Sequence, residues 1–261
     1  MAMRAAVHRV LGACGLVVAL ASPARAQEPS SSPWQFTLTP AGLWALGISG
    51  PATVRGQTSD LDVSFSDIFD HLQGAFSVNF TATKGRVGGF LTAEYLKVGE
   101  DSIVSAVAPP VDVSLKWFTI SGGPSFGVVA TPEVAVSLLA GVRYSAMKGS
   151  LKATDGSFDL QSNTVDWWDP FVGAQITKPI GSRFSLAVKG DVGGFDISEN
   201  TSKLTWNLFP TAAYRFAVGR RSMLVSAGYR FEHIEFTGQG PSVFQMDVDM
   251  SGPALGLTYV F

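Results

Sequence analysis

An alternation of apolar and polar residues, repeated in short segments along the chain, constrains its fold more than any other feature. In residues 183–192, Phe184, Leu186, Val188 and Val192 share one face of an extended strand, and polar or small residues lie between them. A period of two is typical of a β-strand with two different faces. The pattern therefore predicts an all-β fold.

Apolar residues make up 46% of the chain, but after the N-terminal segment no apolar run approaches the roughly 18–20 residues of a membrane-spanning helix. Short turns alternate with long polar connections, which is typical of a transmembrane barrel. Strands in hydrocarbon must pair every backbone amide, and a sheet does so only by closing on itself. We expect an antiparallel up-and-down transmembrane β-barrel of ten strands, with eight as the alternative count and a water-soluble fold as the competing explanation.

The predicted strands cover residues 34–46, 73–83, 87–99, 112–129, 134–147, 165–178, 183–195, 203–217, 222–236 and 244–261. Short turns at 84–86, 131–133, 179–182 and 218–221 are expected to face the periplasm. The long connections, at 47–72, 100–111, 148–164, 196–202 and 237–243, would then lie outside the cell. Aromatic residues expected at the two membrane interfaces are Trp34, Trp44, Tyr95, Tyr144, Trp168, Trp206, Tyr214 and Tyr229.

Two local patterns refine this prediction. Four prolines, Pro124, Pro170, Pro210 and Pro253, recur in every second strand, and because proline lacks a backbone donor we expect bulges or breaks there. In the longest connection, Phe65, Ile68, Phe69 and Leu72 have near-helical spacing. We expect a short amphipathic turn that covers the barrel mouth or lies on the membrane surface.

The N-terminus has the layout of a signal peptide, with Arg4 and Arg9 before an apolar stretch at 10–20 and a small-residue cleavage site at 24–26. We expect a signal peptide at 1–26 and one barrel domain at 27–261. A lipoprotein cleavage site at Cys14 is the alternative, although most of the apolar stretch would then follow the cysteine. Cys14 is the only cysteine, so disulfides and thiol catalysis are excluded in the mature chain.

The charge balance gives no support for nucleic-acid binding. Cleavage removes three arginines from the 19 basic residues of the chain and none of the 21 acidic ones, which leaves a net charge of −5. We expect outer-membrane lipid and lipopolysaccharide as partners, together with periplasmic chaperones and the barrel-insertion machinery during biogenesis. The C-terminal alternation, which includes Leu257, Tyr259 and Phe261, resembles the signal that this machinery reads.

Several short motifs carry a resemblance to a known group of proteins. These are 191–195 (Asp-Val-Gly-Gly-Phe), 228–230 (Gly-Tyr-Arg), 252–256 (Gly-Pro-x-x-Gly) and 64–70 (Ser-Phe-Ser-Asp-Ile-Phe-Asp). Together they resemble a little-characterised branch of the OmpA-like and opacity-like barrels of the bacterial outer membrane. The resemblance implies this fold and location, and it transfers no catalytic residue.

The alternation along the predicted strands places four basic and four acidic side chains on the inner face of the barrel. They are Glu94, Arg143, Asp169, Lys189, Asp191, Arg215, Arg230 and Glu232. A barrel of about eight strands is nearly filled by its own side chains, whereas wide channels need about 16 to 18. We therefore expect mainly a structural network of salt bridges. The same charges could instead line a narrow, low-conductance passage.

Function is predicted only coarsely. The main hypothesis is a structural or surface-exposed outer-membrane protein that is not an enzyme, and a small-solute channel is the alternative. A second alternative is a barrel hydrolase acting on lipid A or peptide, because His71 and His233 each have acidic neighbours, but the sequence has no local nucleophile motif. Neither Asp67, Asp70 and His71 nor Asp247 and Asp249 has the spacing of a dedicated metal site, and we expect no cofactor.

Overall fold

The structure is a computed structural model, and it describes residues 32–54, 57–70, 72–98, 111–153, 159–161, 164–219, 221–238 and 244–261. Apart from Ser32, these residues belong to one compact unit, Pro33–Phe261. The predicted signal peptide at 1–26 and His71 lie outside the described residues.

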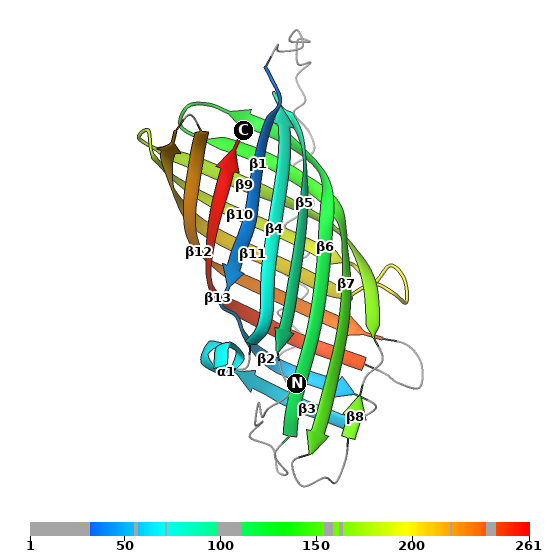
Figure 1. Ribbon diagram of the computed structural model, residues 1–261. Helices are drawn as coiled ribbons and strands as arrows, with labels where there is room; N and C mark the ends of the chain where they lie inside the picture. The colour runs from blue at the N-terminus through cyan, green and yellow to red at the C-terminus, as the bar shows by residue number, and fades with distance from the viewer. Residues whose placement is uncertain are drawn as a thin grey trace, which may run out of the picture. The chain divides into compact units, whose positions relative to one another are not determined.

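Ten antiparallel strands form a closed barrel (Figure 1). In order around the wall they are β1 (Gln35–Trp44), β4 (Leu72–Lys84), β5 (Val87–Val98), β6 (Val111–Ala130), β7 (Ala135–Ala153), β9 (Val165–Ile180), β10 (Phe184–Gly194), β11 (Leu204–Val218), β12 (Arg221–Thr237) and β13 (Phe244–Val260). β13 pairs with β1 and closes the ring. The predicted strand count of ten is confirmed.

The predicted strand boundaries agree with the structure to within two residues except at one end. β7 continues to Ala153 because it stays paired with β6 and also pairs with the short strand β8 (Asp159–Gln161). At the opposite end of the barrel, the short turns contain Gly85, Gly181 and Gly219 at φ values of 58°, 65° and 61°. Glycine adopts this left-handed conformation without the steric cost that other residues carry.

The outer face of the wall is apolar over most of its height. Among the side chains that stay exposed are Leu91, Leu138, Val172, Ile176, Leu186 and Leu255, each with 47–57% of its surface exposed. Aromatic pairs flank this band, with Phe184 on Tyr214 near the short turns and Tyr144 on Trp168 toward the long connections. An apolar band between aromatic girdles is the surface that lipid covers in a membrane barrel.

A bulge in β1 overturns the predicted position of Trp44. The register of β1 shifts around Pro40 against both of its neighbours, β13 and β4. One extra residue reverses which face each later side chain occupies. Leu43 therefore points to lipid with 60% of its surface exposed, and Trp44 lines the interior rather than a membrane interface.

The bulges or breaks predicted at the four internal prolines are confirmed at two of them. The β6–β7 ladder is interrupted at Pro124 and shifts by one residue between Gly127 and Val129, and the β11–β12 ladder is interrupted at Pro210. Pro170 and Pro253 lie in ladders that keep one register, with β7 and β12 respectively. Glycines permit the close approach of neighbouring strands: a Cβ at Gly252 would overlap the carbonyl oxygen of Ala45.

The connection predicted at 47–72 is more structured than the sequence indicated. It contains a hairpin of β2 (Gly47–Val54) and β3 (Gln57–Val63), and β2 pairs with the first half of β13. The predicted amphipathic turn is the helix α1 (Phe65–Asp70), in which Ile68 is buried and Phe69 is 61% exposed. Ser64 caps this helix, because its Oγ accepts from the Asp67 amide and donates to the Asp67 carboxylate. No helix among the described residues is long and apolar enough to cross a membrane.

Candidate functional site inside the barrel

A belt of buried and half-buried ion pairs crosses the lumen, and Arg230 lies at its centre. Its Nη1 donates to Glu94 Oε1 and its Nη2 to Glu232 Oε2, both at 2.6 Å. The guanidinium also lies over the Trp44 ring, with Cζ 4.3 Å from the ring centroid. One side chain of β12 therefore holds β5 and β1 from inside the barrel.

A second ion pair of the belt joins β7 to β10. Arg143 Nη2 donates to Asp191 Oδ1 at 2.6 Å, and both side chains are almost fully buried. The ring of Phe171 lies under the same guanidinium at 5.1 Å, and the Lys189 ammonium lies 5.1 Å from the centroid of Phe90. The structure thus brings six of the eight predicted lumen charges into one region.

Asp169, the seventh, has a different set of partners. Its carboxylate accepts from the amide and hydroxyl of Ser202 at 2.7 and 2.9 Å, and from Trp167 Nε1 at 3.0 Å. Ser202 belongs to the connection between β10 and β11 and is fully buried. Asp169 therefore ties that connection to the interior. Arg215, the eighth, is exposed on β11 near the short-turn end, where its amide pairs with the carbonyl of Arg183.

On the long-connection side of the belt, the interior is apolar. A cluster of thirteen buried residues fills it: Leu46, Ile68, Leu96, Val98, Trp117, Met147, Trp167, Ile234, Phe236, Phe244, Met246, Val248 and Met250. Trp167 and Phe236 stack within this cluster at 4.5 Å. None of the eight charges predicted for the lumen belongs to this cluster.

The other half of the lumen is polar and hollow. A cavity of about 470 Å³ extends from the belt toward the short turns. Its lining includes Thr81, Asn79, Gln175, Ser226 and Thr258, with Arg143, Lys189 and Arg230 among its charged residues. The interior therefore has three layers, which are a polar cavity, an ion-paired belt and an apolar cluster.

The polarity of the two wall faces inverts along the strands. On β13, Leu255 points outward and is 57% exposed, whereas Met246 and Met250 are buried inside and Asp247 and Asp249 between them are exposed. An apolar outer face suits lipid, and a polar outer face around an apolar core suits water. The inversion therefore places the edge of the lipid-covered band near Ser251, and the barrel continues beyond it.

His233 lies on this outer polar face. Its Nδ1 is 3.0 Å from Asp249 Oδ1, and its ring stacks on Trp206. Nucleophilic catalysis would also need a hydroxyl or an activated water held by the histidine. The hydrogen bonds of His233 among the described residues join it to a carboxylate and to no hydroxyl. These residues also contain no group of three or more His, Cys, Asp or Glu able to hold a metal ion.

The C-terminal residues of β13 complete the wall. Leu257, Tyr259 and Phe261 lie on its outward face, and the Phe261 and Phe36 backbones exchange hydrogen bonds of 3.0 and 2.8 Å. The Phe36 and Phe261 rings stack at 5.9 Å. Their role as an insertion signal stays a prediction.

Comparison with known proteins gives matches only among solved structures. The outer membrane protease OmpT from Escherichia coli matches over 92% of this chain and 99% of its own, with 9% identity and a TM-score of 0.48. Neisserial surface protein A matches over 87% of this chain and 96% of its own, with 14% identity and a TM-score of 0.31. Ail of Yersinia pestis, in complex with a heparin analogue, matches over 87% of this chain and 99% of its own, with 11% identity and a TM-score of 0.34. No protein-family model matches the chain, and no curated protein matches it.

A closed antiparallel ladder with a lipid-facing band and two aromatic girdles defines a class, the transmembrane β-barrels. The chain is a small transmembrane β-barrel protein, which spans the membrane through its ten wall strands.

Proposed function

We propose that the protein works as a closed barrel whose functional surface is the end that projects beyond the lipid band. The observation that carries this proposal is the order of layers in the lumen, where the ion-paired belt is covered by the apolar cluster. The projecting end carries β2, β3, α1 and β8 (Figure 1). This architecture suits a structural or surface-exposed protein rather than an open pore.

Two barriers in series would oppose an ion that crosses the lumen. The first is the belt, because separating a buried ion pair leaves uncompensated charges and costs about 3–5 kcal/mol. The second is the apolar cluster, where an ion would lose its water without receiving polar ligands. Both barriers lie in the same lumen, between the polar cavity and the projecting end.

The second candidate function is a narrow small-solute passage, which the polar cavity of about 470 Å³ favours. Its lining of hydroxyls and amides would accommodate a hydrated solute as far as the belt. Transport would then require the belt and the apolar cluster to rearrange together.

Single-channel recording of the refolded mature protein in planar bilayers distinguishes the two candidates, with heat-modifiable gel mobility as the control for folding. We expect a folded protein that gives no conductance steps. Reproducible steps whose ion selectivity changes in Lys189→Gln or Arg230→Gln would overturn the closed-barrel proposal and support the narrow passage.

A further inference from the structure

The barrel wall has an opening between β1 and β4. The ladder between these strands ends at Gly42 and Ser77. Beyond that point β1 stays paired with β13 as far as Trp44, and β4 stays paired with β5 down to Leu72. β2 pairs with β13 and β3 pairs with β2, and β3 is the last strand in this direction. No described strand therefore pairs with this edge of β4.

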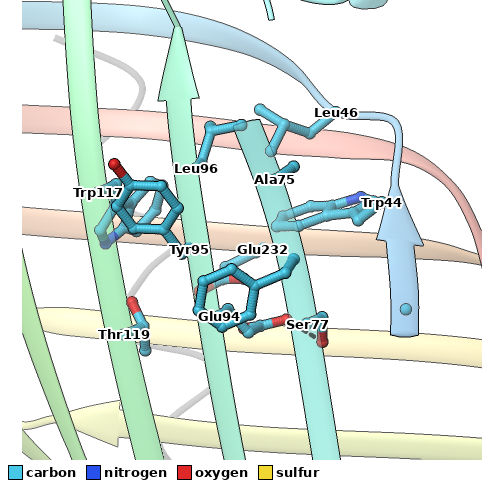
Figure 2. A pocket seen from close by; sticks show the side chains of 12 residues that line it. Trp44, Leu46, Ala75, Ser77, Glu94, Tyr95, Leu96, Trp117, Thr119 and Glu232 are labelled. Carbon is cyan, nitrogen blue, oxygen red and sulfur yellow. Dashed lines mark hydrogen bonds between the residues drawn. The ribbon is translucent and has the colours of Figure 1, made fainter. Parts of the chain in front are cut away.

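A pocket of about 60 Å³ lies at this opening (Figure 2). Its lining combines inward-facing residues, such as Leu96 and Trp117, with Phe76 and Tyr95, which belong to the outer face. The pocket therefore lies in the wall itself, where the β1–β4 ladder ends. Figure 2 shows the Trp44 side chain extending from the end of β1 toward β4, beside Ala75.

The lining of the pocket is mainly apolar. Leu46, Ala75 and Leu96 supply apolar surface, and Trp44 and Trp117 supply their indole rings. The indole Nε1 atoms of both tryptophans are buried away from the pocket surface. The pocket therefore suits an apolar occupant.

The opening lies at the height of an aromatic girdle. Phe76 and Tyr95 stack on the outer face at 5.6 Å, and Leu43 beside the opening is 60% exposed to the lipid side. The short turns lie at the other end of the strands and are expected in the periplasm, so this height corresponds to the outer leaflet. The molecules that meet the opening are therefore the acyl chains of outer-leaflet lipids.

We propose that the pocket between β1 and β4 is a lateral binding site for one acyl chain of an outer-leaflet lipid. The pocket volume exceeds the ~10–15 Å³ that one water requires and suits a segment of a chain rather than a whole lipid. The chain enters between Trp44 and Ala75 and contacts Leu96 and Trp117. Glu94 and Glu232 at the inner side of the pocket are both ion-paired with Arg230 and close it toward the lumen.

Photolabelling with a membrane-confined probe tests this site. The mature protein is refolded in bilayers that contain a phospholipid with a photoreactive group in its acyl chain, and labelled positions are mapped by mass spectrometry. Trp117 and Trp167 are a matched pair, because both are buried inside the barrel and only Trp117 lines the pocket. We expect labelling of Trp117 and Leu96 and none of Trp167.

A substitution that fills the pocket provides the second measurement. Ala75→Trp should abolish labelling of Trp117, whereas Ala227→Trp, at an exposed position of β12, should leave it unchanged. Equal labelling of Trp117 and Trp167 in the wild-type protein overturns the proposal without any variant. If Trp117 is labelled only by a free apolar probe and never by the lipid, the lipid assignment is wrong and the site takes small apolar molecules.

Discussion

Arg230 and Glu94 are 136 positions apart in the chain, and their side chains form a 2.6 Å hydrogen bond inside the barrel. The contact joins β12 to β5, which are not neighbours in the wall. Arg230 contacts Glu232 and Trp44 as well. The barrel is therefore held by side chains that cross the lumen as well as by its ladders.

Replacing Arg230 should destabilise the barrel strongly. Arg230→Gln leaves Glu94 and Glu232 buried without their cation, and breaking a buried ion pair in this way costs about 3–5 kcal/mol. Denaturant unfolding of the refolded protein, followed by tryptophan fluorescence, measures this change. Lys203→Gln is the control, because Lys203 and Glu235 form an exposed pair that should contribute about 0–1 kcal/mol. Equal effects of the two substitutions would contradict the role of the belt.

Removing the Asp169 carboxylate should loosen the connection between β10 and β11. Asp169→Ala leaves three donors from Ser202 and Trp167 without their acceptor, and hydrogen bonds to a charged group contribute about 1.5–3 kcal/mol each. We expect faster hydrogen exchange at the Ser202 amide and earlier proteolytic cleavage near 196–202. Asp166→Ala, at an exposed position on the same strand, should change neither rate.

Removing the extra residue of β1 should leave Trp44 inside the barrel. Deletion of Ala41 places Trp44 four positions after Thr39 instead of five, so a regular strand without the bulge keeps both side chains on the inner face. Arg230 keeps its aromatic partner, and we expect quenching of Trp44 by brominated lipid to stay as weak as in the parent protein. Comparison with Trp44→Phe in each background isolates the Trp44 signal. Stronger quenching of Trp44 in the deletion variant would mean that Ala41 is not the residue that the bulge absorbs.

Adding one methyl group at Gly252 should impair folding. A Cβ at this position would overlap the backbone oxygen of Ala45 on the neighbouring segment, and backbone cannot move aside as a flexible side chain can. Gly190→Ala is the control, because the nearest atoms to a Cβ there are 3.5 and 3.6 Å away. Heat-modifiable gel mobility should show a folded Gly190→Ala barrel and a much reduced folded fraction for Gly252→Ala.

The ten strands could be predicted because their information is local. Alternation defines each strand, and residues such as Gly85 and Gly181 mark where the chain must turn. The face of Trp44 could not be predicted, because it depends on a one-residue bulge that the alternation does not locate. The β2–β3 hairpin was missed because it exists as an addition to β13, and such pairing depends on the assembled sheet.

The candidate site was predicted in part for a similar reason. The alternation identified Arg143, Asp191 and the carboxylate partners of Arg230 as inward-facing residues. Alternation does not show how far along the barrel axis a residue lies. Arg215 was therefore grouped with charges that it does not contact. The apolar cluster was missed because alternation shows which residues share a face, but not at what height the inner face changes from polar to apolar. A usable signal existed in the inversion of polarity between Met250 and Leu255, where the apolar residues move from one face of β13 to the other.

β13 has two sets of partners, and this arrangement sets an order of assembly. Its second half closes the wall against β1, with Thr39 and Thr258 hydrogen-bonded across 219 positions of the chain, and its first half carries β2. Contacts between distant parts of a chain form late because their loop-closure entropy must be overcome first. Until β13 arrives, β1 and the β2–β3 hairpin both present unpaired edges that can join other chains. The pairing of β13 thus ends the period in which the nascent barrel needs protection from aggregation.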